Sequence, residues 1–107
     1  MPYIRTTVSK SINPGQRDIL KSKLGNAIAL IPGKSEAWLM LAFEDNMSMY
    51  FKGDNSADYA YVEVSLFGGA SDAAYDRLTA AISEIISETL GIDSSNIYIK
   101  YEEAEHW

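Results

Sequence analysis

The first half of the chain has the hydrophobic pattern of a strand followed by a helix. Residues 2–8 are rich in β-branched side chains and predict a strand. Residues 12–33 place apolar side chains at intervals of three and four, which predicts a helix with one buried stripe. The stripe consists of Ile19, Leu20, Leu24, Ala27, Ile28 and Ile31. Asn13 and Gln16 have the spacing of a capping box at the helix start, and a Pro-Gly pair ends the helix.

The second half repeats this plan. Residues 58–67 alternate between apolar and polar side chains, which predicts a strand with one buried face. Residues 71–90 predict a long helix that ends at a glycine, and residues 96–101 predict a closing strand. The helical stripe consists of Leu78, Ala81, Ile82, Ile85, Ile86 and Leu90. Between the two halves, the pattern predicts a short hairpin strand at residues 47–51 and a turn at residues 53–55.

Two strand–helix–strand repeats predict a single α/β (α+β) domain over residues 1–107. Right-handed crossovers place both helices on one face of a four-stranded sheet, so the other face stays bare. Residues 37–43 are apolar at every position and are expected to form a strand that is covered on both faces. We therefore expect other copies of the chain to cover the bare face, most simply in a closed ring. The alternative is a buried helical segment, for which seven residues are few.

Composition and charge narrow the class of protein. The 107 residues are 47% hydrophobic and 22% charged, as is typical of one globular domain. A net charge of −6 argues against nucleic acid or an anionic membrane as a partner. The absence of cysteine excludes thiol chemistry, and the single His106 cannot form a metal centre alone. With no signal-peptide pattern and no long apolar run, we expect a soluble, cytoplasmic protein, with leaderless secretion left open.

The second residue raises a chemical question. Pro2 is either a stiff start to the first strand or, once Met1 is removed, a secondary amine at the head of the chain. Methionine is commonly removed when a small residue follows. A free amine at Pro2 is a base and a nucleophile, whereas with Met1 in place the same nitrogen belongs to an inert tertiary amide.

The order of four short segments resembles the tautomerase superfamily. The segments are "MPYI" at the start, "GK" after the first helix, "YVEV" before a glycine pair, and "NIYIKY" near the end. Together with the doubled plan they are most similar to the branch of macrophage migration inhibitory factor and its microbial relatives, up to about Tyr101. This resemblance implies a homotrimer in which three sheets surround a central channel. It also implies active sites between subunits and no cofactor.

The resemblance implies roles for individual residues. Pro2 would be the catalytic base, and Lys34 would line the same pocket as a second catalytic residue. Tyr98 would bind substrate from the neighbouring subunit. Phe67 would form the wall of the substrate pocket, or Leu66 would if the following loop is aligned differently.

Trp38 and Lys100 complete the predicted substrate-binding residues. Trp38 matches an aromatic residue at the pocket edge, and Lys100 stands where the family often has an asparagine. Tyr98 and Lys100 are two residues apart on a predicted strand, so they share one face and Lys100 would bring a cation to the pocket. The chain also lacks the glycine- and asparagine-rich tail that is usual at the family's C-terminus.

These residues suit proton transfer between the carbon and the oxygen of a keto acid. Such a reaction needs a base that is unprotonated near neutral pH, and burial or a nearby cation lowers the pKa of an amine. A lysine would bind the substrate carboxylate and stabilise the enolate, and an aromatic wall suits an arylpyruvate side chain. We therefore expect a cofactor-independent tautomerase that acts on small 2-keto acids such as phenylpyruvate.

Other functions remain open at the level of sequence. One alternative is a cytokine-like receptor-binding protein with vestigial tautomerase activity. Another is a dehalogenase or a decarboxylase on the same fold. The last two chemistries use extra pocket arginines or acidic residues, and this chain has only Arg5, Arg17 and Arg77. A further alternative is an ordinary two-layer module with a role in assembly only. Taken singly, Lys34 is more typical of a solvated lysine after a helix stop, and Tyr98 and Trp38 are more typical of core or interface aromatics.

Overall fold

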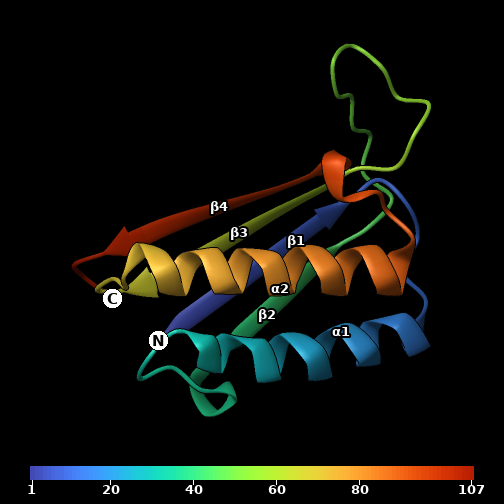
Figure 1. Ribbon diagram of the computed structural model, residues 1–107. Helices are drawn as coiled ribbons and strands as arrows, with labels where there is room; N and C mark the ends of the chain where they lie inside the picture. The colour runs from blue at the N-terminus through green and yellow to red at the C-terminus, as the bar shows by residue number, and fades with distance from the viewer.

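Four strands and two long helices form two layers in the computed structural model, which describes residues 1–107 (Figure 1). The strands are β1 (Pro2–Val8), β2 (Met40–Glu44), β3 (Ala60–Phe67) and β4 (Ile97–Ala104), and the helices are α1 (Pro14–Ala27) and α2 (Asp72–Leu90). The sheet order is β2-β1-β3-β4. The outer pairs are parallel and the central pair β1–β3 is antiparallel. Both helices lie side by side on one face of the sheet, which confirms the predicted fold class.

The helix boundaries follow from local capping. The Asn13 side chain accepts a hydrogen bond from the Gln16 N–H at 2.8 Å, and the Gln16 side chain accepts one from the Asn13 N–H at 3.0 Å. This capping box starts α1 as predicted. Gly91 ends α2 with a φ of 71°, a left-handed conformation that suits glycine.

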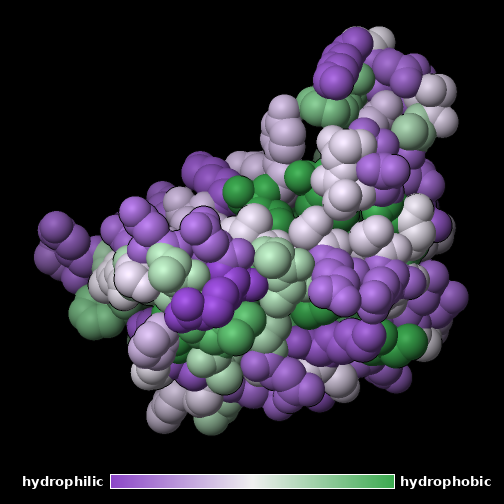
Figure 2. All heavy atoms as spheres, in the orientation of Figure 1, coloured by the Kyte–Doolittle hydropathy of each residue, from purple (hydrophilic) through white to green (hydrophobic).

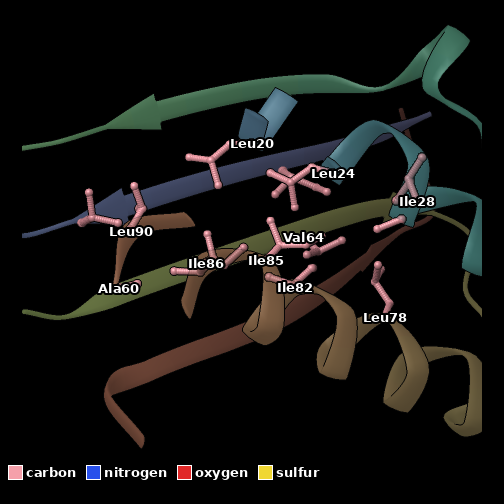
Figure 3. Packing of buried hydrophobic residues seen from close by; sticks show 14 of the residues in the cluster. Leu20, Leu24, Ile28, Ala60, Val64, Leu78, Ile82, Ile85, Ile86 and Leu90 are labelled. Atoms are coloured by element: carbon pink, nitrogen blue, oxygen red, sulfur yellow. The ribbon is translucent and has the colours of Figure 1, made fainter. Parts of the chain in front are cut away.

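The core lies between the helices and the sheet (Figure 3). Its largest fully buried side chains include Ile4, Leu20, Leu24, Ile28, Leu66, Leu78, Ile82 and Ile86. The predicted stripe of α1 is wrong at Ile19, which is 47% exposed because it lies on the flank of the helix beside Leu20. One core position is polar: Thr6 is fully buried on β1 and its hydroxyl has no hydrogen-bond partner. Hydrophilic side chains predominate on the outer surface of the helices (Figure 2).

The other face of the sheet is not covered within this chain. It carries the alternate strand residues, among them Tyr3, Arg5, Tyr61 and Glu63. The predicted strand at residues 37–43 begins later than expected. Residues Glu36–Trp38 form a single 3₁₀ turn, and β2 starts at Met40, which faces the open side. Because β2 is a strand, the alternative of a buried helical segment is also wrong.

The join between the halves projects beyond the sheet (Figure 1). The predicted hairpin strand at residues 47–51 is absent: the only pairing is an isolated bridge between Phe51 and Asp54. The turn lies at Lys52-Gly53, one residue earlier than predicted, with φ values of 55° and 74°. Strand β4 is longer than predicted and extends to Ala104. No helix in the structure combines the length and the apolar composition needed to cross a membrane.

Candidate functional site

The start of β1 brings Pro2 and Lys34 to one end of the sheet, which we call the proline end. Pro2 is buried and pairs across the sheet with Leu66, near the end of β3. The N-terminus lies beside the loop that follows α1 (Figure 1). Lys34 belongs to that loop, and its Nζ donates a hydrogen bond to the carbonyl oxygen of Phe67 at 3.0 Å. A lysine of the first repeat is thereby anchored to a strand of the second.

Lys34 affects the pKa of the amino group at the N-terminus. In the chain as printed that group belongs to Met1, and the nitrogen of Pro2 lies in a peptide bond. Desolvation lowers the pKa of the Met1 amine below its usual value, and the charge of Lys34 and a hydrogen bond with it lower the pKa further. An amine in this environment is unprotonated at a lower pH than an ordinary α-amine.

Leu66 and Phe67 lie on opposite faces of β3, although both were candidates for the pocket wall. Leu66 is fully buried in the core under the helices. Phe67 follows it on the open side with 48% of its surface exposed, and it borders a hollow of about 490 Å³ with Gly68, Glu103, Ala104 and Glu105. Of the two side chains, only that of Phe67 is exposed enough for a ligand to contact it.

Trp38 also lies toward the proline end. It closes the short 3₁₀ turn before β2, and β2 starts with Met40 paired to Tyr3. Trp38 is 70% exposed. An exposed tryptophan of this kind is a candidate contact for a ligand or a partner.

Tyr98 and Lys100 lie away from Pro2 within one chain. Tyr98 pairs with Tyr61, whereas Pro2 pairs with Leu66. These two positions of β3, Tyr61 and Leu66, are five residues apart, about 17 Å along the strand. Lys100 pairs with Glu63, three residues from Leu66 or about 10 Å. The structure therefore brings Pro2, Lys34 and Phe67 together and leaves Tyr98 and Lys100 outside their reach.

An aromatic cluster surrounds Tyr98 at what we call the far end of the sheet. The ring of Phe51 meets the ring of Tyr98 edge-on at a centroid distance of 5.3 Å, and it meets Tyr59 at 5.9 Å. These rings border an apolar hollow of about 330 Å³, which is lined by Met49, Tyr50, Phe51, Tyr59, Ala60, Tyr61, Asn96 and Tyr98. Sequence reasoning missed Phe51 and Tyr59, and the run "MYF" in the join was the signal that could have found them.

The arginines lie elsewhere. Arg5 forms an ion pair with Glu44 on the open face, and this carboxylate raises the pKa of the guanidinium. Arg17 donates to the carbonyl of Ile12 at 3.4 Å at the start of α1, and Arg77 is exposed on α2. The proline end thus has a lysine and no arginine, which disfavours the arginine-dependent chemistries considered above.

Comparison with known proteins adds a family match over the whole chain. The sequence profile described as Macrophage migration inhibitory factor (MIF) matches residues 1–107. No curated protein sequence matches the chain.

Solved structures agree with the profile. The chain is 31% identical to MIF2 of Leishmania major, with a TM-score of 0.92, over 100% of this chain and 91% of that one. It is 25% identical to a macrophage migration inhibitory factor homologue of Prochlorococcus marinus, with a TM-score of 0.83, over 94% of this chain and 86% of that one. A fused 4-OT protein described as a symmetric trimer shares the fold, with 18% identity and a TM-score of 0.84, over 95% of this chain and 85% of that one.

Proposed function

Because the chain belongs to the macrophage migration inhibitory factor family, we propose that it is a cofactor-independent tautomerase of small 2-keto acids. The base is the secondary amine of Pro2, which is freed when Met1 is removed. Phenylpyruvate is the representative substrate. The superfamily includes tautomerases, which supports isomerase chemistry in general, and the choice of substrate rests on the site.

One observation carries the proposal: the head of the chain, Lys34 and the carbonyl of Phe67 meet at a single point. Lys34 is held by that carbonyl at 3.0 Å and lowers the pKa of the adjacent terminal amine. Removal of Met1 places the Pro2 amine one residue further along the same strand, beside the buried Leu66. Burial and a neighbouring cation are the two effects that keep an amine basic yet unprotonated near neutral pH.

The proposed reaction moves one proton. The neutral Pro2 nitrogen takes a proton from the carbon next to the substrate carbonyl, and the carbonyl oxygen becomes an enolate. Lys34 binds the substrate carboxylate and offsets the negative charge that develops on the oxygen. The Pro2 ammonium then returns its proton to the oxygen to give the enol, and the reverse sequence gives the ketone. The exposed ring of Phe67 supports the aryl group of the substrate.

We further propose that the active unit is a homotrimer with a site between subunits. Tyr98 and Lys100 lie about 17 Å and 10 Å from the position of Pro2 along the sheet of their own chain. A site that uses all of these residues therefore needs a second copy. The bare sheet face, which displays apolar and charged side chains without cover, supports this assembly.

The decisive experiment compares three preparations of the protein. They are the chain with Met1 removed, the chain that retains Met1, and a trimmed Pro2→Gly variant, each checked by intact mass. Exchange between enol and ketone of phenylpyruvate is followed by ultraviolet absorbance. We expect turnover only in the first preparation, with a loss of at least about 100-fold in the other two. Equal turnover in all three would rule out Pro2 as the base.

A further inference from the structure

The turn that follows β3 is held in place by the end of β4. Phe67 pairs with Ala104, and the Gly68 N–H donates to the Ala104 carbonyl at 2.9 Å. The residue before Ala104 is Glu103, whose carboxylate accepts a hydrogen bond from the Tyr75 hydroxyl on the first turn of α2. Strand β4, the glycine turn and α2 therefore meet directly behind Phe67.

Gly69 lies against the carboxylate of Glu103. A Cβ at position 69 would lie 2.3 Å from Oε2 and 2.8 Å from Cδ of Glu103. Gly69 is not among the residues with positive φ, so its backbone conformation would accept alanine. The three atoms nearest to that Cβ all belong to the carboxylate of Glu103, which is exposed and bonded to Tyr75.

The Tyr75 hydroxyl stays protonated and can therefore donate to this carboxylate at neutral pH. Burial, together with the hydrogen bond to Glu103 and its charge, raises the pKa of Tyr75 to about 12, so the phenol keeps its proton at neutral pH. The ring is itself fixed, since it packs on Tyr101 at a centroid distance of 4.6 Å. The Tyr101 hydroxyl in turn lies 2.8 Å from the Thr79 hydroxyl, away from Glu103.

We propose that Glu103 is a positioning residue of the proline end. It is clamped between Gly69 and Tyr75, holds the turn after β3, and so fixes the Phe67 carbonyl on which Lys34 is anchored. The effect passes through the backbone, because the two ion pairs of the chain, Arg5–Glu44 and Lys23–Glu88, do not involve Glu103 or Lys34. The inference rests on the proposed tautomerase function, in which Lys34 binds the substrate carboxylate.

Gly69→Ala is the sharpest test, because its Cβ displaces Glu103 without straining the backbone. In trimmed protein we expect KM for phenylpyruvate to rise about tenfold, with kcat within about threefold of wild type, since a misplaced Lys34 weakens carboxylate binding. Glu103→Ala and Tyr75→Phe should give the same pattern. The KM of the double variant Gly69→Ala with Glu103→Ala should be no higher than that of Glu103→Ala alone, since both substitutions disturb the same contact.

Three matched variants separate positioning from general damage. Glu103→Gln keeps an acceptor for Tyr75 and should restore KM to within about twofold of wild type. Glu102→Ala removes a neighbouring exposed carboxylate, and Arg77→Ala removes an exposed side chain of α2; both should leave KM unchanged. Additive effects of Gly69→Ala and Glu103→Ala, or a Glu103→Gln variant as impaired as Glu103→Ala, would overturn the proposal.

A second readout does not depend on turnover. The side-chain NMR signals of isotope-labelled lysines report the surroundings of each ammonium group. Glu103→Ala and Gly69→Ala should shift the Lys34 signal and leave that of Lys10 in place. If wild-type protein shows no tautomerase activity but the Lys34 signal shifts in this way, the proposed function fails and the positioning role stands. An unchanged Lys34 signal contradicts the positioning role whatever the activity.

Discussion

The proline end and the far end of the sheet are built from the same strands but differ in how they are held. At the proline end, Pro2 is buried and Lys34 is tied to a backbone carbonyl. At the far end, Tyr98 is 60% exposed and its ring is steadied mainly by an edge-on contact with Phe51. The first arrangement holds the residues of the proposed chemistry in place, whereas the second presents apolar surface that this chain does not cover.

The difference teaches how the proposed active site is divided. In the proposed site, each chain supplies the Pro2 base, once Met1 is removed, and the Lys34 cation at one end, and part of an aromatic wall at the other. The two parts cannot meet within a chain because β3 keeps them about 17 Å apart. The proposed site between subunits therefore needs a second copy of the chain, whereas the sheet and helices of a single copy form without one.

Removing the cation at the proline end should give the largest effect. In trimmed protein, Lys34→Met should lower kcat/KM for phenylpyruvate by about 100-fold, since a charged hydrogen bond to the substrate contributes about 1.5–3 kcal/mol. Lys21→Met, on the exposed side of α1, is the matched control and should be neutral. A Lys34→Met variant with normal kcat/KM would show that Lys34 does not bind the substrate carboxylate as proposed.

Mixing two defective variants tests whether the ends of different chains cooperate. Trimmed Pro2→Gly should lose at least about 100-fold in activity, as above, and Tyr98→Ala at least about tenfold. When they are unfolded and refolded together in equal amounts, about a quarter of the intersubunit sites combine an intact Pro2 with an intact Tyr98. Activity should then rise to about a quarter of wild type. No recovery, with both variants trimeric by light scattering, would place each site within one chain.

The pH profile measures the influence of Lys34 on the amine. A base acts only when it is unprotonated, so kcat/KM should rise with pH through the pKa of the terminal amine and then level off. Burial and Lys34 lower the pKa of the amine in the chain as printed, and we expect the same direction for the Pro2 amine. Lys34→Met removes the cation and should move the rise to higher pH. A profile that stays in place would assign the shift to burial alone.

The smallest effect is expected from loosening the far end. The Lys10 Nζ donates to the carbonyl of Leu90 at 2.6 Å and caps the C-terminus of α2. Lys10→Met should lower the free energy of unfolding by about 1 kcal/mol, measured by urea titration, because a cation at this helix end is stabilising. Turnover at the proline end should be unchanged. A loss of turnover in folded protein would show that the two ends are coupled.

Most of the fold could be predicted because its signals are local. The capping box of Asn13, the glycine at position 91 and the alternation along β3 each have a short-range physical cause. The failures have tertiary causes. Residues 37–43 are uniformly apolar, but Trp38 belongs to a 3₁₀ turn that delays β2. Thr6 occupies a core position that alternation alone assigns to an apolar side chain.

The candidate site could be predicted only in part. The sequence and its family resemblance identified Pro2 and Lys34, but no pattern indicated that Lys34 is anchored on the carbonyl of Phe67. No pattern pointed to Glu103, because its contacts with Gly69 and Tyr75 join segments about thirty residues apart in the sequence. Such contacts depend on strand register, which a single sequence does not specify.

The anchoring of Lys34 on Phe67 joins the two repeats at the point where chemistry is expected, and the loop between the repeats lies at the opposite end. A protease that cleaves the loop at Lys52-Gly53 would leave two fragments of nearly equal length. The antiparallel pairing of β1 with β3 would still hold them together. The amine, the lysine and their carbonyl would survive the cut together. Recombined half-chains should therefore regain the proton-transfer centre.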